Sequence, residues 1–157
     1  MKTLPVSRWG DRTFVDLAWQ GPKMFSLNRL PWTVPGYRGV YLVSSRKMIY
    51  DYPRGKSSLA YVGMGRVADR LPAHVGRKKG LIELLEDEGT MWFWYASAAQ
   101  GTHPCVESVL LQEFASRHGG LPLLNKARPT PSEDCSGIVV RHHNLSFPYD
   151  FSRRDFP

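Results

Sequence analysis

Short apolar runs along the chain predict strands. Residues 13–19 read as one strand, and the runs 39–43 (GVYLV) and 59–63 (LAYVG) read as two more. The connection between the last two runs is polar and rich in turn residues, so the simplest structure is a β-hairpin. We therefore expect Tyr41 and Tyr61 to lie near each other.

The apolar spacing then becomes helical. Apolar residues recur every four positions, which predicts a helix that begins near Asp69, and residues 81–88 predict a second short helix stopped by Gly89. The aromatic run 91–98 is typical of a strand buried on both faces in the middle of a sheet. An exposed platform for stacking nucleobases is the alternative for this run.

A well-marked helix follows. Pro104 occupies its first position, Thr102 or His103 is the expected cap, and Gly119 stands past its end. Residues 137–141 predict a last short strand.

One acidic residue of this helix stands out. Glu107 heads an apolar stripe that must face the core. The stripe consists of Leu110, Leu111, Phe114 and Ala115. We expect the stripe to direct Glu107 towards the sheet on which Tyr41 and Tyr61 lie, and we expect Glu113 to be solvated on the other side of the helix. An acid satisfied by the helix dipole or by an arginine is the structural alternative for Glu107.

Length and composition indicate one domain. The chain has 157 residues, of which 42% are hydrophobic, which is enough for one core. Residues 1–38, apart from the strand, read as an irregular wrap that packs on the core, and residues 126–157 as a C-terminal extension. No apolar run approaches the length that spans a bilayer, so we expect a soluble protein with no membrane partner.

The formal net charge of +7 favours a polyanionic partner such as nucleic acid. Basic residues gather in the hairpin connection and after the second run. They are Arg46, Lys47, Arg54, Lys56, Arg66, Arg77, Lys78 and Lys79. Their positions suit contact with a phosphate backbone, and an ordinary solvated loop is the alternative for those in the hairpin connection.

The chain contains two cysteines, Cys105 and Cys135, outside any metal-ligand spacing. This number favours a reducing compartment, and we expect a cytoplasmic location, with a single disulfide left open.

An ordered set of residues resembles the GIY-YIG nuclease superfamily. The set is Gly39-Val40-Tyr41, Tyr61-Val62-Gly63, Arg70, His74, Glu107 and Asn125. The resemblance covers residues 39–125 and implies an α/β (α+β) fold, in which a small, mainly antiparallel central sheet is flanked by helices. This fold agrees with the order of elements predicted above.

The resemblance also implies a catalytic role for each residue. Glu107 would be the protein ligand of Mg²⁺ or Mn²⁺, since Mg²⁺ commonly binds one or two carboxylates and fills its other positions with water and phosphate oxygens. Tyr41 would be the general base or would orient the attacking water, and Tyr61 would hydrogen-bond the phosphate or the water.

The other three residues would support the phosphate and the site. Arg70 would contact the phosphate with its guanidinium group, and His74 would shuttle a proton or hold the phosphate. Asn125 would fix the geometry of the site from behind. Arg66 is the alternative to Arg70, because one residue is missing between Tyr61 and the arginine of the family pattern.

The sequence thus predicts a Mg²⁺-dependent DNA endonuclease, with RNA as an alternative substrate. One active site cuts one strand, so cutting both strands would need a dimer or successive nicks. A binding adaptor of the same fold with little cleavage activity and a nuclease toxin are the alternative functions.

Overall fold

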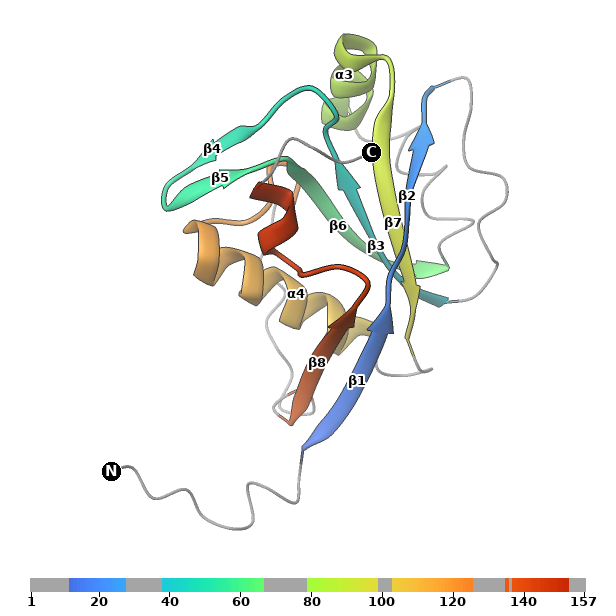
Figure 1. Ribbon diagram of the computed structural model, residues 1–157, viewed down its shortest axis with the longest axis vertical. Coiled ribbons are helices and arrows are strands. Elements are labelled where there is room, and N and C mark those ends of the chain that lie inside the picture. Colours follow the sequence, from blue (N-terminus) through green and yellow to red (C-terminus); the bar gives the residue numbers. More distant parts are fainter. Residues whose placement is uncertain are drawn as a thin grey trace.

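A four-stranded antiparallel sheet with the strand order β2-β7-β3-β6 lies at the centre of the protein (Figure 1). The computed structural model describes residues 12–27, 38–66, 79–98, 103–125, 135 and 137–152. In chain order the elements are β1 (Thr13–Ala18), β2 (Gln20–Phe25), β3 (Arg38–Ser44), β4 (Tyr50–Tyr52), β5 (Gly55–Ser57), β6 (Leu59–Arg66), α3 (Lys79–Glu88), β7 (Met91–Ser97), α4 (His103–His118), β8 (Ile138–His143) and the 3₁₀ helix η2 (Tyr149–Ser152). The predicted α+β class is confirmed, and the helix expected near Asp69 lies outside the described residues.

The inner strands β7 and β3 are the apolar runs of the sequence. Residues 39–44 of β3 are all buried, because both faces of an inner strand are covered. β7 lies between β2 and β3, which confirms the prediction of a buried central strand for residues 91–98. The hairpin is confirmed as well: β3 and β6 pair antiparallel with Tyr41 opposite Gly63, and β4 and β5 form a small second hairpin in their connection.

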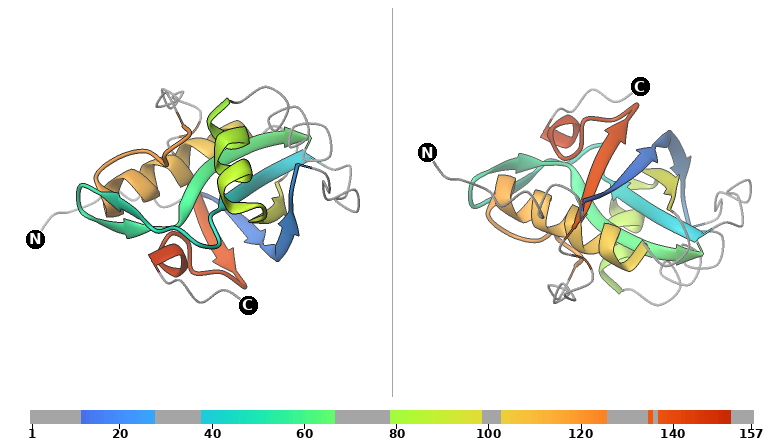
Figure 2. Two further views of the ribbon diagram at one scale, coloured as in Figure 1. Left: turned by 90° about the horizontal axis from the view of Figure 1, so that it is seen from above. Right: turned by 90° about the horizontal axis from the view of Figure 1, so that it is seen from below.

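Each face of the sheet is covered by a different helix (Figure 2). Successive side chains of β3 point to opposite faces. Val40 and Leu42 therefore pack in the cluster that contains the α4 side chains, whereas Tyr41 and Val43 pack in the cluster that contains the α3 side chains. α3 and α4 consequently lie on opposite faces of one sheet.

Both ends of the described chain enter the core on the α4 face. β1 pairs with β8 in parallel, and the strands predicted for residues 13–19 and 137–141 are thereby confirmed. The cluster on this face includes side chains from both ends, among them Leu17, Trp19, Phe147 and Phe151. These segments are structural parts of the fold.

One strand was not predicted. Residues 20–25 form β2 and pair with β7, so the expectation of an irregular wrap is wrong for them. The Gly21-Pro22 pair reads as a break in the sequence. β2 is an edge strand, where a proline costs no ladder hydrogen bond on its open side, and the pairing register shifts between Gln20 and Lys23.

The helices end where glycine predicts. α3 begins at Lys79, two residues before the expected start, and the N–H of Gly89 donates to the carbonyl of Leu85. The N–H of Gly119 makes the same bond at the end of α4, and both glycines have positive φ. His103, one of the two expected caps, is the first residue of α4.

A disulfide joins Cys105, in the first turn of α4, to Cys135 before β8. The sequence left this bond open. Disulfides persist in oxidising compartments, which differs from the reducing setting favoured by the cysteine count. Neither helix in the described part of the chain has the length and apolar character needed to cross a membrane.

Candidate active site

Tyr41 and Tyr61 lie side by side on the α3 face of the sheet. Their ring centroids are 6.0 Å apart with the ring planes at 46°, so the predicted proximity is confirmed. Tyr41 is fully buried, whereas Tyr61 is 7% exposed. Of the two residues, Tyr61 is therefore the less completely buried.

The glycines of the two tripeptides are required by close packing. A Cβ atom at position 63 would overlap the phenol ring of Tyr41, and a Cβ at position 39 would overlap the backbone carbonyl of Ala96 in β7. Gly63 therefore makes room for the Tyr41 ring across the strand pair. This contact explains why a tyrosine in one tripeptide goes with a glycine in the other.

Asn125 is bonded to the edge strand β6. Its side-chain Nδ2 donates to the carbonyl of Val62 and its Oδ1 accepts from the Val62 N–H, both at 2.9 Å. The N–H of Leu124 also donates to the carbonyl of Ala60 at 2.8 Å. Asn125 thus satisfies the backbone of the residue that follows Tyr61, which fits the expected role of holding the site from behind.

Glu107 shares the sheet with the tyrosines but lies on the other face. The apolar stripe of α4 is buried as predicted, and Glu107 itself is partly buried. The stripe packs against Val40 and Val62, whereas Tyr41 points to the α3 side. The predicted packing of the stripe against this sheet is therefore confirmed, and the structure adds that the stripe and the two tyrosines pack on opposite faces of the sheet. α4 does pack against β6, the strand that carries Tyr61 (Figure 1).

Glu113 has a partner, contrary to the expectation of a solvated side chain. Its Oε2 accepts a hydrogen bond of 2.9 Å from Nε2 of His142 in β8, and its side chain is 32% exposed. The reason is that β8 packs beside α4, a contact between distant segments that the helix register alone does not reveal.

Two of the basic hairpin residues have structural contacts. The guanidinium group of Arg46 donates to the Thr90 hydroxyl and lies 5.0 Å from the ring centroid of Trp92. Arg54 binds the C-terminal carbonyls of α4: its N–H donates to His118 at 2.9 Å and its Nη2 to Ala115 at 3.2 Å. Arg54 therefore caps the C-terminal end of α4, and the predicted contact with a phosphate backbone would be a second role.

The remaining predicted binding residues have fewer observable contacts. Lys47 and Lys56 are exposed. Four of the predicted residues lie outside the described part of the chain: Arg70, His74, Arg77 and Lys78. For Arg66 and Lys79 the structure describes the backbone but not the side chain. Their roles stay predictions.

A buried acid that the sequence did not reveal organises the basic connection. Glu88, at the end of α3, is 4% exposed, and its Oε1 accepts from the Ser45 hydroxyl and from the Lys47 N–H at 2.9 Å. Ser45 also accepts from the N–H of Met48. Glu88 thereby fixes the backbone that carries Arg46 and Lys47.

The described side chains supply only part of the ligand set that a metal ion needs. Within the described ranges, no three His, Cys, Asp or Glu side chains gather to hold a metal. Glu107 offers one carboxylate, so Mg²⁺ held there would take its other ligands from water and a substrate phosphate, as this ion commonly does.

Family models, curated proteins and solved structures were compared with the chain, and none of them matches. The GIY-YIG resemblance therefore rests on the ordered residues and on how they pack.

Proposed function

We propose that this protein is a metal-dependent endonuclease of the GIY-YIG type that hydrolyses phosphodiester bonds in DNA. The observation that supports this best is the packing of Tyr41 against Tyr61 and over Gly63. Two tyrosines that merely lie on neighbouring strands do not require a glycine beneath one of their rings, as Tyr41 requires Gly63. The double hydrogen bond from Asn125 to Val62 adds a further element of the pattern at the same strand.

Each side chain has a distinct part in the proposed reaction. Tyr61 is assigned to the phosphate, because it is the less completely buried of the two residues. Tyr41 is buried behind it, which favours orienting the attacking water over taking its proton directly. Mg²⁺ bound by Glu107 would neutralise charge on the phosphoryl group and assist the leaving oxygen.

The two residues expected on the preceding helix complete the proposal. Arg70 binds the phosphate through its planar guanidinium group, and His74, one turn later, moves a proton or holds the phosphate. Duplex DNA would approach along the exposed Lys47 and Lys56, and Glu88 holds the backbone of Lys47 in place. Binding should therefore weaken steeply as the salt concentration rises.

Incubation of the purified, disulfide-intact protein with supercoiled plasmid tests this function. We expect nicked or linear DNA with Mg²⁺ or Mn²⁺ and intact plasmid with EDTA. Plasmid that stays supercoiled in metal while the protein still retards it in a gel would instead identify a binding adaptor. Protein that neither cuts nor binds would refute the nucleic-acid function.

The disulfide favours a second candidate, a nuclease toxin that passes through an oxidising compartment. A bond between Cys105 and Cys135 is stable outside the cytoplasm and serves no purpose in a reducing one. A cytoplasmic repair or restriction enzyme would work equally well with both thiols reduced. Mass spectrometry of protein taken from its native cell, with free thiols blocked at lysis, distinguishes the two: a disulfide supports the toxin, and two blocked thiols support the cytoplasmic enzyme.

A further inference from the structure

A cavity of about 610 Å³ opens between the outer face of α4 and the segment that follows β8. Its volume falls within the range of roughly 300–1,000 Å³ typical of small-molecule sites. α4 contributes polar side chains one turn apart, and the facing wall is aromatic. The side chains that matter are Glu113, Arg117, His142, Phe147 and Tyr149.

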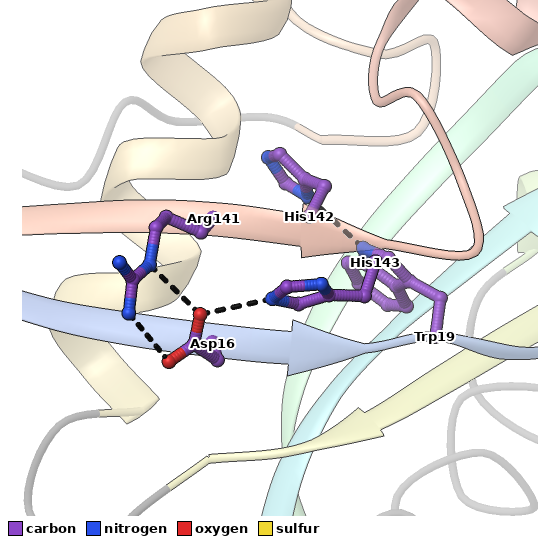
Figure 3. A network of polar contacts seen from close by, with 5 residues as sticks. All are labelled: Asp16, Trp19, Arg141, His142 and His143. Carbon is purple, nitrogen blue, oxygen red and sulfur yellow. Dashed lines mark hydrogen bonds and ion pairs between the residues drawn. The ribbon is translucent and has the colours of Figure 1, made fainter.

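The hydrogen bonds of His142 fix its protonation. Figure 3 shows His142 and His143 leaving β8 in different directions, with His142 bonded to Trp19. The indole Nε1–H of Trp19 donates to Nδ1 of His142 at 3.0 Å, and an indole nitrogen can only donate. Nδ1 must therefore be unprotonated, so the proton of the neutral ring is on Nε2 and is donated to Glu113.

The floor of the cavity consequently holds a charged and oriented carboxylate. Because His142 is neutral, it does not cancel the charge of Glu113. Oε2 of Glu113 accepts from His142, and within the described part of the chain no side chain or backbone group donates to its Oε1. The side chain is 32% exposed, so Glu113 can accept hydrogen bonds from a ligand.

The opposite wall offers a flat ring, and α4 holds a cation over it. Tyr149 is 59% exposed, and the guanidinium group of Arg117, on α4 like Glu113, lies over its ring with the guanidinium carbon 5.3 Å from the ring centroid. Phe147 is buried beneath, 5.3 Å from the His142 ring between centroids. An aromatic face beside a guanidinium group is a common way to hold a nucleobase and its phosphate.

We propose that this cavity binds a guanine nucleotide. Guanine has two adjacent N–H donors, N1–H and the N2 amino group, which match the two oxygens of the Glu113 carboxylate. Adenine and cytosine place a ring acceptor beside their amino group, and uracil flanks its single N–H with carbonyls, so each would meet the carboxylate with a repulsive acceptor. Stacking on Tyr149 and a phosphate contact with Arg117 complete the site.

The positive charge of Arg117 argues against a cationic ligand, which is the other kind of ligand that the Glu113 carboxylate would attract. A free amine or a guanidinium group would pair with Glu113 but would be repelled by Arg117, one turn further along α4. A nucleotide satisfies both residues, because its base is neutral and its phosphate is anionic. The same chemistry is present in a free nucleotide and in an unpaired guanine of a nucleic acid. The site uses the outer face of α4, so nucleotide binding can be tested independently of the proposed DNA cleavage.

Nuclear magnetic resonance of the ¹⁵N-labelled, disulfide-intact chain in EDTA tests this proposal without any cleavage. The probes are GMP, IMP, which lacks the N2 amino group, and AMP, and the reporter is the Trp19 indole N–H. We expect GMP to shift this signal and to bind at least about tenfold tighter than IMP or AMP, the scale of one charge-assisted hydrogen bond. Equal affinities, or an unmoved indole signal, would overturn the guanine site.

Two variants locate the contacts. Glu113→Gln should weaken GMP binding at least about tenfold and remove the preference over IMP, whereas Glu86→Gln, the same change at an exposed site on α3, should bind GMP as the wild type does. Arg117→Gln should weaken GMP more than guanosine. Unchanged GMP binding by Glu113→Gln would overturn the proposal.

The source of the guanine is identified with an oligouridine that carries one guanosine. If it binds at least about tenfold tighter than GMP, the ligand is an unpaired guanine in a nucleic acid, and if GMP binds as well or better, it is a free nucleotide. Binding of arginine amide in preference to GMP would show that the cavity takes cations and would refute the nucleotide.

Discussion

The two faces of the central sheet differ in what covers them and in what chemistry they offer. On the α4 face, segments from both ends of the chain join the helix over a largely aliphatic sheet surface, and a disulfide adds a covalent tie. On the α3 face, the described cluster is smaller and rich in aromatic rings. The hydroxyls of Tyr41 and Tyr61 belong to this second face, whereas the Glu107 carboxylate belongs to the first.

The separation of the tyrosines from Glu107 limits where a catalytic site that uses both could lie. Neither face alone holds both the tyrosines and the acid. β6 is the edge strand of the sheet, α4 packs against it, and Asn125 binds its backbone. The residues can therefore act together only around this edge.

The largest effect is expected from Glu107→Gln. Removal of the metal-binding charge should abolish metal-dependent cleavage, while DNA binding stays equal or becomes tighter because one negative charge leaves a phosphate site. Stability should stay close to that of the wild type, since glutamine keeps the shape of the side chain. Plasmid cleavage, gel retardation and urea unfolding measure the three quantities.

Glu86→Gln is the control for this change, since it removes an equal charge from the exposed side of α3 and should cut normally. If Glu107→Gln still cleaves, the α4 face takes no part in catalysis, and the site would have to be built on the tyrosine face alone.

Reduction of the disulfide should give the next largest effect. The bond closes a loop across a sequence separation of 30 residues, and the chain-entropy relation gives about 3–4 kcal/mol of stabilisation for such a loop. Urea unfolding with and without dithiothreitol measures the difference. A Cys105→Ser/Cys135→Ser double variant, which is insensitive to dithiothreitol, serves as control. A loss below about 1 kcal/mol would mean that packing alone secures the start of α4.

Tyr41→Phe tests the other face. The change deletes one hydroxyl and keeps the ring, so cleavage should fall by about a hundredfold, the scale of a lost general base or water-orienting group, with the fold intact. Tyr95→Phe makes the same deletion at a buried tyrosine that has no assigned role and should cut at close to the wild-type rate. Wild-type cleavage by Tyr41→Phe would remove Tyr41 from the mechanism.

The smallest effect is a pH dependence from His118, at the end of α4. Burial lowers the pKa of this ring below the usual 6.5, and the ring stacks on Phe114. A histidine whose pKa is lowered by folding favours the folded state while the ring is neutral, so its contribution to the free energy of unfolding is fully present above pH 6.5. This contribution declines as the pH falls towards the pKa of the folded state, by at most about 1.4 kcal/mol per pH unit. His118→Phe should flatten the decline between pH 7 and 5 in urea unfolding. An unchanged slope would mean that other groups cause it.

Several features could be predicted because they depend on local sequence. The strand pair of Tyr41 and Tyr61 follows from two β-type runs around a turn, and the ends of both helices follow from Gly89 and Gly119. The stripe of α4 follows from helical periodicity. In each case the nearest neighbours in sequence decide the outcome.

Other features depend on contacts between distant segments and left no local signal. Glu88 ends the acidic run of α3, yet it is buried, because Ser45 and the backbone of the hairpin connection lie against it. Glu113 meets His142 across 29 positions of sequence. Gly21 marks an apparent break, and only the position at the sheet edge permits a strand there.

The sequence by itself determined which residues are apolar, where most of the central strands lie, where both helices end, and which side chains share a helical stripe, because these properties follow from 2.0- and 3.6-residue periods and from glycine conformation. Tertiary structure alone decided which face of the sheet each helix covers. Strand alternation sends Tyr41 to one face and its neighbours to the other, but both faces of an inner strand are apolar, so no local pattern tells α3 from α4 as the partner. The burial of side chains from both ends of the chain under α4 made that choice, and it placed Glu107 across the sheet from the tyrosines.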